Sequence, residues 1–377
     1  MSWPLVKLND ICRPRQWKTL SKSSLSDSGY PVYGAGGKIG FHSKFNHEFP
    51  TLMIACRGTC GEVSISEPNS YINGNMMALD ELDSSRVDIR YLYRYLARRG
   101  FEDVISGAVQ QQITGRGLAK VEIPLPSLPE QKRIVAILDK ADAIRRKRQQ
   151  AIQLADDFLR AVFLDMFGDP VTNPRGWEVK TLASTTKDWR GGASIKPDDF
   201  TDIGFPVLHK GAINHHGRIV LDDSKKTFVS NQFAEAKKSS LVGRDCVAIT
   251  LRDLVPSGPS IGLMADLSDY EVDKYLLSQG AYGFSVKPKE LHAGYLVALS
   301  NHDGFRRKFK KISVGSTQIH IRSSDLKELT FPVPPIELQL RYSVIRRAVI
   351  DFQRKAAAGV VEGLLPSLSQ KAFSGQL

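Results

Sequence analysis

The stretch from Ser127 to Gly168 constrains this chain most, because its pattern predicts one long helix in the middle of the sequence. Ser127 is placed to cap the helix with Glu130 three residues later, a capping-box pattern. Gly168, followed by Asp169-Pro170, ends it. At about 1.5 Å per residue the predicted rod is about 55 Å long. Such a rod is not stable alone in water, so it needs a partner helix.

Residues along this helix recur at alternating steps of four and three, which is the spacing of a coiled-coil seam. Two arginines, Arg145 and Arg148, occupy the middle of the seam. We expect them to pair with carboxylates on the partner helix, such as Asp351 or Glu362, in preference to an acidic surface on another subunit. The predicted seam is Ile134, Leu138, Ala141, Arg145, Arg148, Ile152, Ala155, Leu159, Val162 and Met166, and Phe163 and Phe352 complete the predicted surface for helix packing and subunit docking.

The sequence repeats itself at an offset of 208 residues, which indicates two related halves. The starts of the halves also match, because Trp3 and Leu8 keep the spacing of Trp177 and Leu182. A second helical stretch, from Ile336 to about Phe373, follows the second half, so the order is domain, helix, domain, helix. The matched pairs are Gly107 with Gly315, Gln110 with Gln318, Ile113 with Ile321, Leu118 with Leu326, Pro124 with Pro332, Pro126 with Pro334, and Gln131 with Gln339.

These features predict an α+β protein with a pseudo-two-fold internal repeat, in which two long antiparallel helices separate two globular domains as a coiled coil. Antiparallel pairing would return the second helix to the first domain. Pro366 should break or kink that helix, because a proline inside a helix costs about 3 kcal/mol. The predicted segments are 1–126 for the first domain, 127–170 for the central helix, 171–334 for the second domain and 335–377 for the C-terminal helix.

The charge of the chain favours a polyanionic partner. Its net charge is +12 and its isoelectric point is near 9.4, which favours nucleic acid over an acidic membrane. The sequence shows no signal-peptide pattern and no apolar run of the roughly 20 residues that span a bilayer, so we expect a cytoplasmic location and no membrane partner. The four cysteines, Cys12, Cys56, Cys60 and Cys246, lack the spacing of a zinc site and are expected to be reduced.

Catalytic patterns are missing from the sequence. It has no phosphate-binding G-x-x-x-x-G-K-[ST] loop, and the glycine-rich Gly34-Ala-Gly-Gly-Lys-Ile-Gly segment has the wrong spacing for a dinucleotide site. His215-His216 has no glutamate at metalloprotease spacing. The acidic pairs Asp198-Asp199 and Asp222-Asp223 are typical of solvated turns. We therefore expect no catalytic residues and no metal site, and the chain is predicted not to be an enzyme.

Four segments in a fixed order resemble the specificity (S) subunit of type I restriction–modification systems, known as HsdS. They span the whole chain and are Ile123-Pro-Leu-Pro-Ser-Leu-Pro-Glu-Gln with the helix that follows to Phe167-Gly-Asp-Pro, Asn173-Pro-Arg-Gly-Trp, Phe331-Pro-Val-Pro-Pro-Ile-Glu-Leu-Gln and Lys371-Ala-Phe-Ser-Gly-Gln-Leu. The chain departs from the pattern where Leu338 stands in the place of Glu130.

The resemblance implies a non-catalytic subunit with two target-recognition domains, each reading one half of a bipartite site in double-stranded DNA. It implies that the two conserved helices of that family set the spacing between the half-sites and dock two methyltransferase (M) subunits. Motor and nuclease (R) subunits would join for cleavage. No cofactor is expected in this chain, whereas S-adenosylmethionine, ATP and magnesium are expected in the partner subunits.

Lysine, arginine and glutamine residues that are predicted to lie mostly in loops are the candidates for DNA contacts. Phosphates attract lysine and arginine, whereas guanidinium and amide groups can bond to base edges. Two other readings of the chain stay open on the sequence: a protein–protein scaffold whose charge is incidental, and a fused nuclease. The candidates are Lys38, Lys44, Arg57, Gln110, Gln111 and Arg116 in the first domain, and Arg190, Lys196, Lys210, Arg218, Arg252, Arg306, Arg307 and Arg322 in the second.

Overall fold

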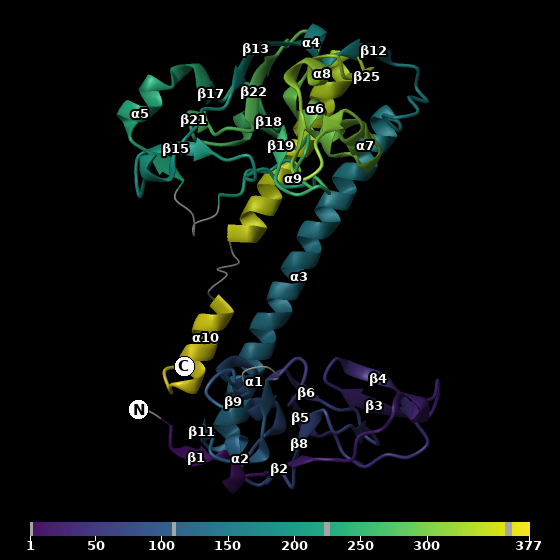
Figure 1. Cartoon of the computed structure of the whole chain (residues 1–377), viewed down its shortest axis with the longest axis vertical. Coiled ribbons are helices and arrows are strands. Elements are labelled where there is room, and N and C mark those ends of the chain that lie inside the picture. The colour runs from purple at the N-terminus through teal and green to yellow at the C-terminus, as the bar shows by residue number, and fades with distance from the viewer. Residues whose placement is uncertain (1–2, 108–110, 222–226, 359–363) are drawn as a thin grey trace. The chain divides into compact units, whose positions relative to one another are not determined.

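The structure is a computed structural model that describes residues 3–107, 111–221, 227–358 and 364–377 (Figure 1). It divides into two compact units. The first holds Met1–Arg148 with Val360–Leu377, and the second holds Gln149–Gly359. Helix α3 (Leu128–Phe167) begins in the first unit and ends in the second, within a residue of the limits predicted from Ser127 and Gly168.

The first unit contains short strands and few helices. Its largest sheet has the strand order β2-β8-β5-β6, and a three-stranded sheet has the order β4-β3-β7. The strands are β1 (Leu5–Lys7), β2 (Arg13–Gln16), β3 (Tyr30–Gly34), β4 (Gly37–His42), β5 (Leu52–Ala55), β6 (Val63–Ile65), β7 (Tyr71–Ile72), β8 (Met76–Asp80), β9 (Ile105–Ser106), β10 (Gln112–Ile113) and β11 (Glu122–Pro124). The helices besides α3 are α1 (Ile89–Arg99), α2 (Gly115–Leu118) and α10 (Leu364–Phe373).

The second unit is larger but is built in the same way, with sheets ordered β13-β22-β18-β20 and β14-β16-β15-β21-β17. Its strands are β12 (Glu178–Thr181), β13 (Thr186–Gly191), β14 (Phe200–Thr201), β15 (Phe205–Leu208), β16 (Phe228–Val229), β17 (Leu241–Gly243), β18 (Cys246–Thr250), β19 (Arg252–Asp253), β20 (Met264–Asp266), β21 (Lys274–Leu277), β22 (Ala281–Val286), β23 (Ser313–Val314), β24 (Ile319–Ile321) and β25 (Thr330–Val333). Its helices besides α3 are α4 (Leu182–Thr185), α5 (Asn231–Ala236), α6 (Ala293–Asn301), α7 (Asp303–Lys311), α8 (Ser323–Lys327) and α9 (Ile336–Ala358).

Strand pairing confirms the internal repeat. The four-stranded sheets match strand for strand, and the parallel pair β3–β7 corresponds to the parallel pair β15–β21. The first strand of each domain pairs antiparallel with its last strand, β1 with β11 and β12 with β25. The predicted α+β class with two repeated domains is therefore confirmed, and the extra strands β14, β17 and β19 account for part of the greater length of the second domain.

A buried glutamine at the start of each long helix ties the domain to that helix. In the first unit, the Gln131 amide donates to the carbonyl oxygens of Pro126 and Arg86, both at 2.8 Å, and its oxygen accepts from the Asp88 N–H. In the second unit, the same three bonds join Gln339 to Pro334, Glu290 and His292. Both glutamines are fully buried. Asp88 and His292 cap α1 and α6, so each glutamine also holds the start of a helix.

A buried tyrosine gives each domain a second connection. Tyr91 on α1 and Tyr295 on α6 donate to the carbonyl oxygens of Pro124 and Pro332, both at 2.7 Å. The same rings pack against the end of the other long helical region, Tyr91 against Phe373 of α10 and Tyr295 against Phe167 of α3. Each unit therefore holds the start of one helix and the end of another.

Tryptophans near the start of each domain complete this arrangement. The indole N–H of Trp3 donates to Ala372 at 3.0 Å, and that of Trp177 donates to Phe167 at 2.9 Å. In the second unit α9 runs antiparallel to α3, because Tyr342 packs on Phe163 while the later Gln353 binds the carbonyl oxygen of the earlier Ile152. The antiparallel pairing predicted for the helices is confirmed in this unit.

Within the predicted C-terminal helical region 335–377, the described residues include the helices α9 and α10. Gly359, Glu362 and Gly363, which include the predicted partner Glu362, lie outside the described residues. Pro366 is the third residue of α10, in the first turn, where a missing backbone N–H breaks no intrahelical bond.

Arg145 and Asp351, which were predicted to pair with each other, each have a partner on their own helix. Arg145 bonds to Asp142 at 2.9 Å, three residues earlier on the same helix, and Asp351 pairs with Arg354 at 3.6 Å. The reason is local geometry, since a carboxylate one turn away on the same helix is always within reach of a long side chain.

The other seam residues divide by depth. Ile134, Leu138 and Phe163 are buried, whereas the Phe352 side chain is 51% exposed. The remaining half-buried positions of the predicted seam are Ala141, Arg148, Ile152, Ala155, Leu159, Val162 and Met166. No helix in the described ranges is both long and apolar enough to cross a membrane.

The glutamine contacts predict separable effects on the two units. We expect Gln131→Leu to lower the free energy of unfolding of the first unit by about 2–4 kcal/mol, because three buried backbone groups lose their partner. Gln339→Leu should do the same to the second unit. Hydrogen exchange measured by mass spectrometry should show lost protection in α1 and β11 for the first variant, and in α6 and β25 for the second. Gln153→Leu, at an exposed position of α3, is the matched control, and equal protection in all three variants would contradict the prediction.

His292 predicts a pH dependence that is confined to the second unit. Its Nδ1 accepts from the Gly294 N–H at 3.0 Å and lies 2.7 Å from the Ser343 hydroxyl on α9. Burial lowers the pKa of His292, so the fold favours the neutral ring. That stabilisation is present above the unfolded-state pKa of about 6.5 and is lost as the pH falls through the folded-state pKa. Calorimetry should show a larger fall in the melting temperature of the second unit on acidification for the wild type than for His292→Asn, which keeps a neutral cap. Equal falls would contradict this.

Candidate nucleic-acid interface

Two arginines occupy equivalent positions in the repeated domains. Arg57 follows β5 by two residues, and Arg252 follows β18 by two residues. The residue before each arginine is bound in the same way, because the Cys56 carbonyl oxygen accepts from Ile113 at 3.1 Å and that of Leu251 accepts from Ile321 at 2.9 Å. Each arginine therefore lies beside a β-hairpin, β9–β10 in the first domain and β23–β24 in the second.

Three loops of the first domain come together around Arg57. The Thr59 hydroxyl binds the carbonyl oxygen of Ala35, at the β3–β4 turn, at 2.5 Å. The Cys60 thiol donates to the Gln111 carbonyl oxygen at 3.2 Å. This bond joins the turn that carries Arg57, Thr59 and Cys60 to the β9–β10 hairpin. Arg57 and Gln111 are both exposed. The structure thus brings together two of the residues predicted for DNA contact, at one end of the sheets.

The corresponding loops of the second domain carry Lys210 and Arg252 close together. The Thr250 hydroxyl binds the Lys210 carbonyl oxygen at 2.6 Å, as Thr59 binds Ala35. Gly280 lies between the two side chains at a φ of +95°, and a Cβ there would lie 3.0 Å from the Arg252 Cβ and 3.2 Å from the Lys210 Cδ. Only glycine lets both cationic side chains approach this closely.

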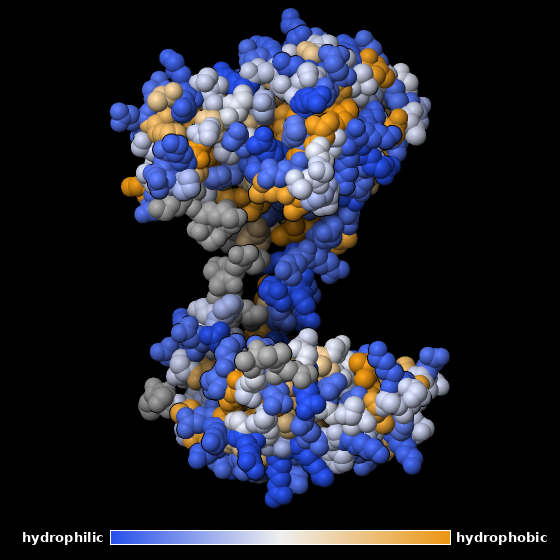
Figure 2. Space-filling model, viewed as in Figure 1, coloured by the Kyte–Doolittle hydropathy of each residue, from blue (hydrophilic) through white to orange (hydrophobic). Residues whose placement is uncertain are grey.

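Most of the other predicted contacts are exposed. Lys38 pairs with Glu67 at 3.5 Å and lies over the Phe41 ring, and Gln110 lies outside the described residues. The remaining exposed cations on the predicted list are Lys44, Arg116, Lys196, Arg307 and Arg322. Figure 2 shows that hydrophilic residues cover most of the visible surface of each unit, so exposure alone does not distinguish a DNA-binding face.

Three predicted arginines are bound to other groups of the second unit. Arg218 donates to Asp156 on α3 at 2.8 Å and also to Gln353 on α9. Arg190 donates to the Leu241 carbonyl oxygen, and Arg306 donates to that of Pro259 at 2.6 Å. These contacts give the three side chains structural roles within the second unit.

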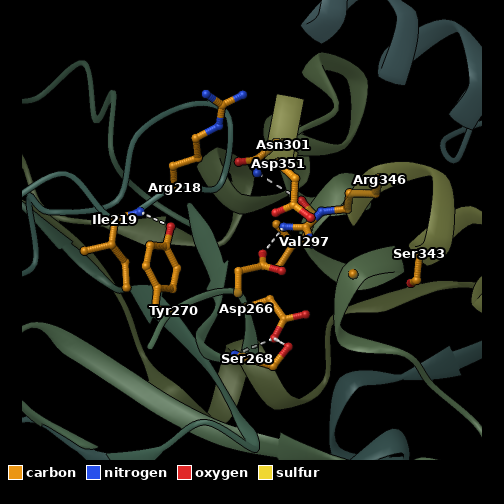
Figure 3. Close-up of polar contacts among 12 residues, drawn as sticks. Arg218, Ile219, Asp266, Ser268, Tyr270, Val297, Asn301, Ser343, Arg346 and Asp351 are labelled. Carbon is orange, nitrogen blue, oxygen red and sulfur yellow. Dashed lines mark hydrogen bonds and ion pairs between the residues drawn. The ribbon is translucent and has the colours of Figure 1, made fainter. Parts of the chain in front are cut away.

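A buried ionic cluster beside Arg218 anchors α9 to the second domain (Figure 3). Arg346 pairs with Asp269 at 2.7 Å, and each side chain is only 6% exposed. Burial and the neighbouring Asp269 raise the pKa of Asp266, whose carboxylate accepts from Ser268. The Tyr270 hydroxyl accepts from the Ile219 N–H at 2.6 Å, which fixes the adjacent loop. Neither Asp269 nor Arg346 has a sequence neighbour that marks it, so no sequence pattern predicts this pair.

One histidine of the His215-His216 pair contacts a carboxylate. The His216 ring lies 3.3 Å from Asp156, which Arg218 already binds. Across the ranges that the structure describes, no three histidine, cysteine, aspartate or glutamate residues lie together in a way that could hold a metal ion. The four cysteines are free thiols, and burial raises the pKa of Cys12 to about 12.

Comparison with known proteins assigns this architecture to a family. The model of the type I restriction modification DNA specificity domain matches residues 2–154 and 174–345. The specificity subunit of the type I restriction enzyme MjaVIII from Methanocaldococcus jannaschii is 19% identical over 325 residues, which cover 82% of this chain and 75% of that protein. A putative specificity subunit from Haemophilus influenzae, S.HindORF215P, is 28% identical over 128 residues, 33% of each chain.

The solved S subunit of a type I restriction–modification system from M. genitalium has the same fold, with a TM-score of 0.67 at 16% identity over 100% of this chain and 96% of that chain. The chain belongs to the type I restriction–modification DNA specificity family. It is a specificity subunit with two target-recognition domains, as the resemblance implied, and this assignment displaces the scaffold reading.

The contacts of Arg218 predict that replacing it lowers the stability of the second unit rather than removing a contact with DNA. Arg218→Ala leaves the largely buried Asp156 carboxylate without its guanidinium partner and frees Gln353. We expect the free energy of unfolding of the second unit to fall by about 2–4 kcal/mol. Arg252→Ala, which removes the same side chain from a position without such partners among the described residues, is the control and should change stability by about 0.5 kcal/mol or less. Thermal unfolding of both variants measures this, and equal melting temperatures would contradict it.

Proposed function

We propose that the two domains read the two halves of a bipartite double-stranded DNA site. The observation that carries this proposal is that the same loop arrangement occurs in both domains. In each, an arginine, Arg57 or Arg252, follows an equivalent strand and lies beside an equivalent hairpin. The surrounding loops differ in sequence and length, so two domains built alike would read different bases. A net charge of +12 supports an electrostatic contribution from phosphate contacts.

The helices suit a spacer that also docks methyltransferase subunits. Helix α3 is continuous over 40 residues and belongs to both units. Its apolar residues Leu154 and Phe158, and Leu340, Val344 and Phe352 of α9, are exposed within the part of the chain that the structure describes. Such uncovered side chains favour contact with partner subunits.

The catalytic steps are assigned to partner subunits in this proposal. S-adenosylmethionine would bind a methyltransferase subunit, and ATP and magnesium would serve the motor and nuclease subunits. This chain would supply target choice and geometry. A purified complex with its methyltransferase subunit should prefer one bipartite duplex over random DNA, and binding should weaken as salt rises. Equal binding of this complex to every DNA sequence would contradict the proposal.

Lengthening α3 gives a test of the spacer role. Insertion of one heptad between Lys140 and Gln150 adds about 10 Å, or about three base pairs. We expect methylome sequencing to find unchanged half-sites and a longer unread spacer. Lys147→Ala, at an exposed position in the same segment, is the control without a length change. Altered half-site bases with an unchanged spacer would overturn the ruler role.

A further inference from the structure

We propose that Arg57 and Arg252 each read a guanine, one in each half of the DNA target, and that Gln112 and His320 are the base contacts beside them. This inference rests on the proposed function, because it assigns the bases that the two domains distinguish. The geometry points to a shared reading position that the internal repeat has placed in both domains.

The first step is the equivalence of the two arginines. Strands β5 and β18 hold the same place in sheets of the same order, β2-β8-β5-β6 and β13-β22-β18-β20. Each arginine follows its strand by two residues, and the preceding carbonyl oxygen is bound by Ile113 or Ile321. These isoleucines are themselves matched at the repeat offset of 208 and are both buried. The backbone that carries each arginine is therefore held in the same way.

The second step is the neighbour of each arginine. Strands β19 and β24 pair so that Arg252 is opposite His320. In the first domain the bond from Ile113 to Cys56 brings the adjacent Gln112 alongside the turn that carries Arg57. Gln112 and His320 are matched at the offset of 208. Because neighbouring residues of a strand point to opposite faces, the burial of Ile113 and Ile321 turns Gln112 and His320 outward.

The third step is availability. In the part of the chain that the structure describes, neither Arg57 nor Arg252 has a hydrogen-bond or ion-pair partner for its guanidinium, in contrast to Arg190, Arg218 and Arg306. Asp253 follows Arg252 directly, yet its carboxylate accepts from the Ser260 N–H at 2.8 Å and the Ser260 hydroxyl at 2.6 Å. The acidic neighbour thus organises its own loop and leaves the arginine open to a ligand.

The two turns are also preorganised. In the first domain Gly58 and Gly61 have φ values of +79° and +89°, which permits a tight turn on either side of Thr59 and Cys60. In the second domain Asp253 holds the longer loop through Ser260 and also accepts from the Val255 N–H. A guanidinium on an ordered turn loses less freedom on binding than one on a mobile loop.

The chemistry of the side chain selects the base. A guanidinium donates two parallel hydrogen bonds to the O6 and N7 atoms of guanine in the major groove, whereas a lysine ammonium is a point charge without this fork. Lys210 beside Arg252 then suits a phosphate contact. The counterpart of Lys210 in the first domain is Ala35. The affinity of the second domain for DNA should therefore fall more steeply with rising salt than that of the first.

The test uses the complete complex with its methyltransferase subunit and compares Arg57→Lys with Arg252→Lys. These variants keep the charge and lose the fork. We expect the wild-type methylome motif to contain a guanine in each half-site. Arg57→Lys should relax that one position of the first half-site, and Arg252→Lys that of the second, with about 5- to 150-fold loss of discrimination in duplexes that carry single substitutions. Binding to random DNA should change by about twofold or less, because the charge is retained.

Two exposed arginines serve as matched controls. Arg244 lies beyond the opposite end of β18, and Arg13 begins β2 and pairs with Glu81. Arg244→Lys and Arg13→Lys should leave both half-sites unchanged. Melting temperatures of all four variants should equal that of the wild type, which separates base reading from folding.

The outcomes are distinguishable. A bipartite motif that lacks guanine in either half, or that the lysine variants leave unchanged, overturns this inference while the proposed function stands. Weaker binding to all sequences alike assigns the arginines to phosphates and also overturns it. The absence of any bipartite motif would instead overturn the proposed function itself.

Discussion

The buried glutamine at the start of each long helix is the interaction on which both units depend. A primary amide has two donors and an oxygen acceptor, and burial makes any unmet bond costly. Gln131 and Gln339 meet all three needs with backbone groups from the proline-rich segment and from the start of a domain helix. The geometry between a domain and its outgoing helix is therefore set by directional bonds rather than by apolar contact alone.

The far ends of the helices are held by a different device. Trp3 and Trp177 cap helix ends through their indole N–H groups, and Phe373 and Phe167 pack on matched tyrosines. At a seam position between these anchors the two halves diverge, because the buried Leu138 corresponds at the repeat offset to the buried Arg346. Arg346 is tolerated only because Asp269 accompanies it. Such a buried pair adds directional pairing more than net stability.

The loops that we propose to contact DNA extend from the sheets of each domain. Arg57 and Arg252 extend from equivalent strands, but a short glycine turn follows the first and a loop organised by Asp253 follows the second. A shared frame with different loops can change the bases that are read without changing the packing of either domain. Outside these loops, apolar side chains of α3 and α9 such as Phe158 and Val344 are exposed.

The sequence by itself determined the elements whose signals are local or repeated. Periodicity located α3, and the fixed offset paired Gln131 with Gln339, because both patterns are visible along one chain. Only the tertiary structure decided which cationic side chains are bound within the protein and which are left to contact a ligand. Arg218 looks no different in sequence from Arg252, yet it binds Asp156 and Gln353, which lie 62 and 135 residues away. Gln112 and His320 were likewise not among the predicted contacts. The folded chain places each beside one of the two arginines, because each shares a strand with a buried isoleucine. Side-chain pairing depends on distances between remote residues, and only the folded chain sets those distances.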